Sequence, residues 1–174
     1  MEHLTPNDCT ATSWSVTVDG SQIVWHKAAS TLLDDARMLP QEVYLMDSDG
    51  SNCRALPVPV PQSASGGQLS PDGTQLLFTM SATPTFGYSY TSTLFLTAID
   101  SSSPAVPLPP LLNGSQTISS AQWSPSGDAI LVNANCGVRH GLFKLDLASQ
   151  TWSALTDLTA DVSFGGWCVF EIHK

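Results

Sequence analysis

Two closely spaced carboxylates are the best candidate for metal chemistry in this chain. The segment Asp47-Ser48-Asp49-Gly50-Ser51-Asn52 begins like the D-x-D-G start of a calcium-binding loop. Such a loop needs a glutamate at its twelfth position, where this chain has Val58. We therefore expect a turn between two strands, with Gly50 at positive φ and Asp49 bonded to the backbone, and no metal site.

No residue pattern typical of nucleophilic catalysis is present. The segment Gly87-Tyr88-Ser89-Tyr90-Thr91 lacks the second glycine of G-x-S-x-G. The sequence has no phosphate-binding or dinucleotide-binding glycine pattern and no H-E-x-x-H pair. Four histidines are scattered at positions 3, 26, 140 and 173, and we expect His26 and His140 in loops or at a rim. The sequence thus predicts no catalytic residue and no cofactor; it favours a non-enzyme and leaves the question open.

The segment 81–92 is a candidate contact surface for another molecule. Phe86, Tyr88 and Tyr90 stand there among serines and threonines, a mixture typical of protein-binding loops. We predict partner contact through these three aromatic residues and His140. The alternative interpretation is an ordinary solvated loop with a rim histidine beside it.

The acidic composition excludes two kinds of partner. The 174 residues include 6 Lys and Arg against 15 Asp and Glu, a formal net charge of −9. Nucleic-acid grooves and anionic membrane surfaces both need clustered cations, so neither is expected as a partner. No apolar stretch approaches the roughly 18 residues of a membrane span. The N-terminus lacks the features of a secretion signal, so the protein is periplasmic or extracellular only if a leader has been removed, and otherwise cytoplasmic.

Four cysteines could form two disulfide bridges in three different connectivities. None stands in a C-x-x-C pair, which argues against zinc or redox chemistry. The favoured interpretation is four partly buried thiols. The cysteines are Cys9, Cys53, Cys136 and Cys168.

A turn motif recurs three times along the chain. Its glycines fall at intervals of 53 and 54 residues, at Gly20, Gly73 and Gly127. A second, apolar element follows each turn, at 42–47, 93–98 and 141–146. A short third element centres on Leu56, Leu108 and Leu155. Three elements repeated in one order indicate tandem copies of one structural unit.

The repeated elements have the character of β-strands. They are short, rich in β-branched, aromatic and other apolar residues, and bounded by Gly, Pro, Asp, Asn and Ser. In the turn 70–73, proline sets the first corner, aspartate can bond its own backbone and glycine supplies a positive φ. The segment 31–39 is the nearest approach to a helix, but Pro40 would end it, so we expect a long loop. Each unit is therefore predicted to be a four-stranded antiparallel sheet in an all-β fold.

At these residues the chain resembles the TolB-like β-propeller family, whose repeats are WD40-like. The resemblance rests on Trp123-Ser124-Pro125-Ser126-Gly127 before an apolar strand and on the strand and turn at 43–52, and it covers about residues 12–156. It implies a partial β-propeller of about three four-stranded blades in a single domain. We expect these blades at about 12–60, 64–110 and 117–157, with residual strands at 160–172 opening a fourth.

The resemblance implies a non-catalytic, periplasmic module that binds another protein. The alternatives are the propeller of a prolyl-oligopeptidase-like serine peptidase and a carbohydrate-active propeller enzyme. Propellers close with about four to eight blades, so three blades leave two faces uncovered. The chain is then a segment of a longer protein, a copy that associates with another copy to complete a ring, or an open wedge.

Five tryptophans add a prediction about packing. Trp14 and Trp123 stand before their turns and are interpreted as equivalent residues that pack between blades. The alternative is that one tryptophan is exposed and recognises a ligand.

Overall fold

The computed structural model describes residues 10–17, 19–28, 41–56, 63–81, 92–100, 103–111, 116–136 and 139–157. All the secondary-structure elements in these ranges are β-strands, which confirms the prediction of an all-β fold. The strands are β1 (Thr10–Val16), β2 (Gln22–Ala28), β3 (Gln41–Asp47), β4 (Arg54–Ala55), β5 (Ser63–Leu69), β6 (Gln75–Ser81), β7 (Ser92–Ala98), β8 (Val106–Pro107), β9 (Gln116–Trp123), β10 (Ala129–Cys136), β11 (Arg139–Asp146) and β12 (Thr151–Ala154). The loop expected at 31–39 and the residual strands expected at 160–172 lie outside the described residues.

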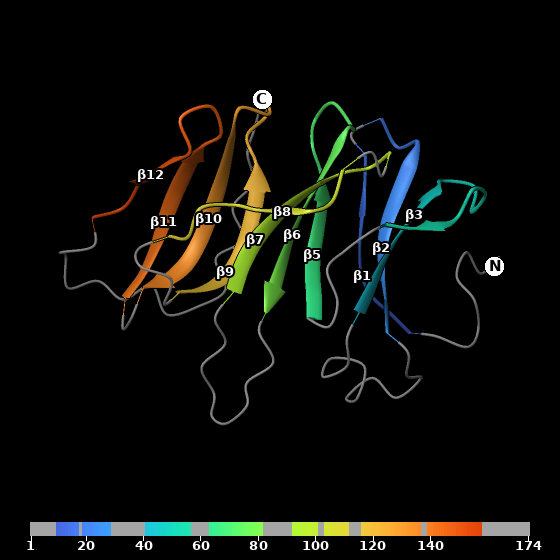
Figure 1. Cartoon of the computed structure of the whole chain (residues 1–174), viewed down its shortest axis with the longest axis horizontal. Helices are drawn as coiled ribbons and strands as arrows, with labels where there is room; N and C mark the ends of the chain where they lie inside the picture. Colours follow the sequence, from blue (N-terminus) through green and yellow to red (C-terminus); the bar gives the residue numbers. More distant parts are fainter. Residues whose placement is uncertain are drawn as a thin grey trace.

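The strands form three four-stranded antiparallel sheets, which we call blades 1, 2 and 3. Blade 1 holds β1–β4, blade 2 holds β5–β8 and blade 3 holds β9–β12, and within a blade each strand pairs with the next. Figure 1 shows the blades side by side in chain order. Within the described residues, one parallel pairing, between Gln41 of β3 and Ser63 of β5, links the backbones of blade 1 and blade 2. This is the repeated four-stranded unit that the sequence predicts.

The same turn opens each blade, between its first and second strands. The backbone N–H groups of Thr17, Ser70 and Ser124 donate to carbonyls five residues further on, and each receives a bond at its own carbonyl from the glycine three residues later. The glycines have φ of 72°, 71° and 75°, a conformation that strongly favours glycine. The predicted glycine positions are confirmed, and the bonds fix which residues of the blades are equivalent.

Blades 1 and 2 pack through one apolar cluster. Val24, Val43 and Leu56 contribute from blade 1, and Leu76 and Phe78 contribute from blade 2. Blade 2 uses alternate residues because successive side chains of a strand point to opposite faces. All five are buried, so this interface is a true core rather than a surface contact.

Blades 2 and 3 pack through a second cluster of the same design. Leu77 and Leu108 face it from blade 2, and Trp123, Ile130 and Phe143 face it from blade 3. Leu76 and Leu77, which are neighbours in β6, therefore point to opposite faces of blade 2: Leu76 packs against blade 1 and Leu77 against blade 3. The fold is held together by two successive cores, one between each pair of neighbouring blades.

The predicted equivalence of Trp14 and Trp123 is wrong. The turn bonds align Thr17 with Ser124, so Val16 is the counterpart of Trp123 and Trp14 stands two residues earlier. Trp123 is buried against blade 2, whereas Trp14 is 72% exposed. Packing between blades holds for Trp123 alone, because no described blade precedes blade 1.

Candidate functional site

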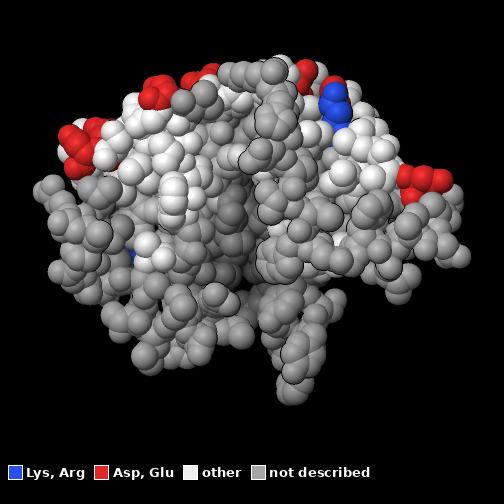
Figure 2. Space-filling view, turned by 180° about the vertical axis from the view of Figure 1, so that it is seen from behind, with Lys and Arg blue, Asp and Glu red and all other residues white. Residues whose placement is uncertain are grey.

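The candidate site is the edge of the blades that carries the repeated turns, which we call the turn edge. It comprises the turns 17–21, 70–74 and 124–128, one from each blade, with the turns 47–51 and 146–150 that follow a third strand. The turns between the first and second strands lie at the top of Figure 1, whereas the turn after β3 projects to the right of blade 1; Figure 2 shows acidic side chains along the top edge. The antiparallel order of the strands brings the turns to one side of the sheets.

Asp72 illustrates how each turn holds its carboxylate. Its Oδ1 accepts hydrogen bonds from Ser70 Oγ at 2.5 Å, from Thr74 N at 3.1 Å and from Thr74 Oγ1 at 2.9 Å. Hydrogen bonds to a carboxylate favour its charged form. The bond from Ser70, with those from Thr74, lowers the pKa of Asp72 below its ordinary value. The charge at this turn is therefore fixed in place at neutral pH.

The other turns repeat this arrangement with different partners. The pKa of Asp19 is lowered to about 2, first by the side chain of Thr17 and then by the backbone and side chain of Ser21. The pKa of Asp128 is lowered mainly by the hydroxyls of Ser126 and Ser124. The turns after β3 and β11 likewise lower the pKa of Asp49 and Asp146 through Ser51 and Ser149. The turn edge is thus a row of ionised carboxylates.

Two grooves of similar size lie between neighbouring turns. One, of about 370 Å³, is lined by residues of blades 2 and 3, among them Asp72, Gln75, Trp123 and Leu147. The other, of about 340 Å³, is lined by the turn at 17–22 and by Pro71, Asp72 and Gly73. Asp72 lines both grooves. The repeat therefore produces a groove of similar size at each of the two boundaries between described blades.

The segment 47–52 folds as the predicted turn. Gly50 has φ of 85° and donates its N–H to the carbonyl of Asp47 at 2.9 Å. Asp49 Oδ1 accepts the N–H of Ser51 at 2.8 Å, and Asp47 Oδ2 accepts Asn52 Nδ2 at 2.6 Å. The carboxylates are occupied by their own turn. Among the described residues, no group of three or more His, Cys, Asp or Glu could hold a metal ion.

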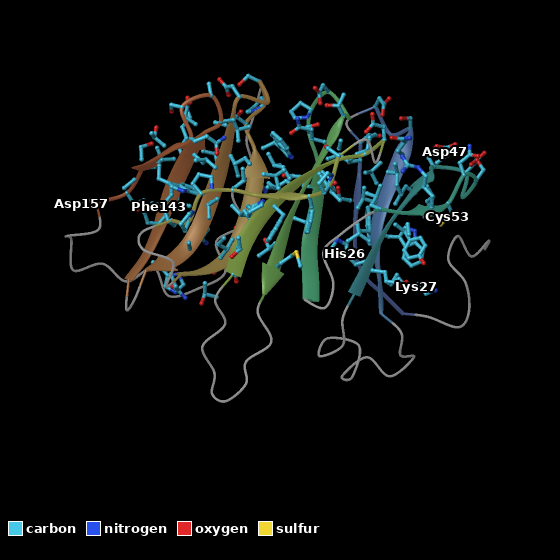
Figure 3. All side chains as sticks on the ribbon, viewed as in Figure 1. His26, Lys27, Asp47, Cys53, Phe143 and Asp157 are labelled. Atoms are coloured by element: carbon cyan, nitrogen blue, oxygen red, sulfur yellow. The ribbon has the colours of Figure 1, made fainter. Side chains whose placement is uncertain are left out.

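His26 is not the loop or rim residue that the sequence predicts. It lies in β2, is 1% exposed, and its Nε2 accepts the backbone N–H of Gly67 from blade 2 at 3.1 Å. In Figure 3 it sits where blade 1 meets blade 2. A contact between residues 41 apart leaves no signal in the local sequence. His26 therefore links blade 1 to blade 2 and is not accessible to solvent.

The residues predicted to contact a partner fall only partly within the described structure. His140 lies half-buried in β11, where it pairs with Asn135 at the end of the blade opposite the turns. Phe86, Tyr88 and Tyr90 lie outside the described residues. The role of these three aromatic residues in partner contact stays a prediction. The sequence analysis interpreted the aspartates of the turn edge only as turn-forming residues and did not propose them as a binding surface.

Of the cysteines, Cys53 is described as a free thiol and is exposed, so its interpretation as partly buried is wrong. It follows the turn after β3, on the outer side of blade 1 (Figure 3). Cys9 and Cys168 lie outside the described residues.

Comparison with known proteins identifies the class of fold. No family model matches the chain, and no curated protein matches it. Among solved structures, 86% of the chain superposes on 47% of a putative TolB from Agrobacterium tumefaciens, with a TM-score of 0.61 and 17% identity. In the same way, 93% of the chain superposes on 36% of TolB from Acinetobacter baumannii, with a TM-score of 0.60 and 16% identity. A structure from a study of two prolyl endopeptidases matches over 86% of this chain and 22% of its own, with a TM-score of 0.60 and 10% identity.

These likenesses define a partial β-propeller. The TolB structures are among the propellers that the blades resemble, as the sequence motifs predict, and the prolyl endopeptidase structure matches with the same TM-score as the second TolB structure. The chain spans less than half the length of the TolB structures that it matches. No helix among the described residues is long and apolar enough to cross a membrane.

Proposed function

We propose that this chain is a non-catalytic TolB-like propeller module that binds a protein partner, and that the turn edge is where it does so. The observation that carries the proposal is the pair of grooves between neighbouring turns, both lined by Asp72. Their repetition at successive blade boundaries suits an extended polypeptide lying across the blades. The ionised row beside them suits a segment with basic side chains.

The grooves offer more than charge to such a segment. Trp123, Leu147 and Pro71 contribute apolar surface to the larger groove, beside Asp72 and Gln75. Aromatic and apolar anchors with a charged rim are typical of protein-binding surfaces. The hydrogen bonds within each turn hold the carboxylates in place before a partner arrives, which lowers the entropic cost of binding.

The test is capture of a partner by the native chain and by two variants that each lose one charge. Asp72→Asn keeps an oxygen that can accept the Thr74 N–H but removes a charge from both grooves. Glu42→Gln removes an exposed charge at the opposite end of blade 1 and is the control. We expect salt-sensitive capture that Asp72→Asn weakens and Glu42→Gln preserves. Equal capture by both variants, or no partner together with turnover of a peptide or sugar panel, would contradict the proposal.

A second candidate is the propeller of a serine peptidase. It is favoured by the superposition on prolyl endopeptidases, in which the matched part is 22% of the longer chain. In that case the coding sequence beyond Lys174 would hold a hydrolase domain with a G-x-S-x-G elbow. Reading that sequence separates the two candidates, since a binding module requires no such domain.

A further inference from the structure

A buried histidine accepts a hydrogen bond at the boundary between blades 1 and 2. His26 Nε2 accepts the backbone N–H of Gly67 at 3.1 Å, and the residue is 1% exposed (Figure 3). A ring nitrogen of histidine accepts a hydrogen bond only when it carries no proton. His26 is therefore uncharged in the folded chain, with the lone pair of Nε2 directed at the backbone of β5.

The residues on both sides of this bond are particular to the first boundary. A Cβ on Gly67 would lie 2.7 Å from His26 Nε2, so the contact needs glycine. The turn bonds make Thr79 of blade 2 the counterpart of His26, and Ala121 of blade 3 the counterpart of Gly67. Threonine does not titrate in the physiological range. The boundary between blades 2 and 3 thus has no equivalent of the histidine.

The described strands around His26 direct their charged side chains away from its ring. Strands β1, β5 and β6 contain no titratable residue. In β2, Lys27 points to the opposite face of blade 1, where its ammonium lies over the ring of Tyr44. In β3, the residue opposite His26 is Val43, which is fully buried in the cluster shared by the two blades.

The other charges of blade 1 lie further from the ring. Glu42 is exposed on the face that turns away from blade 2. Asp47 ends β3 and is bonded within its own turn. Arg54 donates to the carbonyl of Ile99 beside the turn edge. A proton on His26 would therefore be buried among apolar side chains without a counter-charge from these strands, which disfavours the charged form.

The boundary between blades 2 and 3 is joined by groups that do not titrate. Trp123 Nε1 donates to the carbonyl of Gln68 at 3.2 Å, and Trp152 Nε1 donates to the carbonyl of Pro109 at 3.0 Å. An indole N–H is a donor only. The buried cluster at this boundary consists of apolar residues. Mild acid therefore acts on the first of the two described boundaries and leaves the second unchanged.

We propose that His26 is an acid-sensitive link, which holds blade 1 against blade 2 at neutral pH and releases it when the imidazole takes up a proton. Protonation gives Nε2 a hydrogen that points at the N–H of Gly67, so an acceptor is lost and two donors face each other. The charge also lies among Val24, Val43 and Leu76, out of contact with water. Histidine is the side chain whose unperturbed titration falls between pH 5 and 8.

Release of this boundary changes one of the two grooves of the turn edge, a consequence that rests on the proposed function. The smaller groove is lined by the turn at 17–22 of blade 1 and by Pro71, Asp72 and Gly73 of blade 2, so its shape depends on the boundary that His26 holds. The larger groove lies between blades 2 and 3. The pKa values of Asp19 and Asp72 lie below 3.8, so both carboxylates stay ionised at pH 5. Mild acid thus removes one groove from the binding surface and leaves these two charges in place.

The first experiment is urea denaturation of the native chain, His26→Gln and His140→Gln at pH 7.5 and pH 5. Glutamine carries Oε1 at the place of Nε2, so it can accept the Gly67 N–H but takes up no proton. Below about pH 6.5 the unfolded native chain binds a proton at His26 that the folded chain excludes, so stability falls as the pH falls. From pH 7.5 to pH 5 the equilibrium constant of unfolding should rise about ten- to thirtyfold more in the native chain than in His26→Gln. His140→Gln, at a half-buried histidine of blade 3, is the control and should follow the native chain.

A second measurement needs no variant. Nitrogen-15 NMR of the native chain at pH 7.5 should show His26 Nε2 without a proton. Titration toward pH 5 should shift the amide signal of Gly67 and leave the indole N–H signals of Trp123 and Trp152 in place. A proton on Nε2 at pH 7.5 overturns the proposal, and so does an equal pH dependence of the native chain and His26→Gln. Loss of all three signals together also overturns it, because the whole chain then unfolds instead of one boundary opening.

Both measurements use the chain alone, so they decide the role of His26 whether or not the turn edge binds a protein. The partner captured by the native chain at pH 7.5 should be captured less at pH 5.5, and His26→Gln should capture it equally at both. Equal capture by the native chain at both pH values overturns the regulation of the groove. If no partner is captured at pH 7.5, the proposed function fails, and denaturation and NMR still decide the acid-sensitive link.

Discussion

Gly67→Ala probes the packing of blade 2 on blade 1 directly. The added Cβ would lie 2.7 Å from His26 Nε2, 3.2 Å from Val24 Cγ1 and 3.4 Å from Leu76 Cδ1. His26 is 1% exposed, so its ring has little room to move aside. The same displacement stretches the bond from the Gly67 N–H to His26.

The expected cost follows from three contributions. Overpacking a core costs about 1–3 kcal/mol, and a weakened hydrogen bond adds about 0.5–1.5 kcal/mol. Alanine restricts the unfolded chain and offsets about 0.4–1 kcal/mol. We expect a net loss of about 0.5–4 kcal/mol in the free energy of unfolding, and for a chain of this size a loss of about 2 kcal/mol lowers Tm by about 4–8 °C.

Urea denaturation of four proteins tests this reasoning. The set is the native chain, Gly67→Ala, His26→Asn and the double variant. The shorter asparagine makes room for the new methyl group, so Gly67→Ala should cost at least about 0.5 kcal/mol less in the His26→Asn background. An equal loss in both backgrounds, or no loss in either, would refute the assignment of the clash to His26.

Three further predictions concern the turns and the second interface. Trp123→Phe keeps an aromatic ring but loses the bond to the Gln68 carbonyl, and should cost about 1 kcal/mol in urea denaturation; an unchanged midpoint would contradict it. Gly73→Ala meets no atom within 4 Å but has φ of 71°, so its cost of about 1 kcal/mol should come from the backbone alone, and a neutral effect would contradict that origin. The lowered pKa values of Asp19 and Asp72 give stability that is complete above their unfolded pKa, near 3.8, and that is lost as the pH falls below it, toward about 2 for Asp19. Circular dichroism should show acid unfolding in that window, shallower in Asp72→Asn, and an identical slope in the variant would exclude this contribution.

Local chemistry made the turns and strands predictable. Gly20, Gly73 and Gly127 have the positive φ that the turn motif predicts. Their spacing, together with the two apolar elements that follow each turn, predicted three copies of a four-stranded unit. Contacts between blades depend on residues far apart in the chain. His26 was therefore assigned to a loop or rim. The error in aligning Trp14 with Trp123 could have been found in the sequence, since Trp123 stands four residues before Gly127 and Trp14 stands six residues before Gly20.

The candidate site was only half predictable. The sequence indicated Asp49 and Asp72 as turn formers, but their alignment along one edge follows from the antiparallel order of the strands. The grooves between turns require two neighbouring blades at a defined separation, which no local pattern encodes. The aromatic residues Phe86, Tyr88 and Tyr90 remain a prediction.

Pairing between sequence neighbours has a consequence for how the chain acquires its shape. Among the described residues, apart from the pairing of Gln41 with Ser63, the backbone ladder of each strand runs only to strands of its own blade. Main-chain contact order is therefore low for an all-β protein, which favours rapid folding. The backbone pairing of a blade can form once its own residues have left the ribosome, whereas each apolar core forms only when the next blade docks, so synthesis orders the assembly from first blade to last.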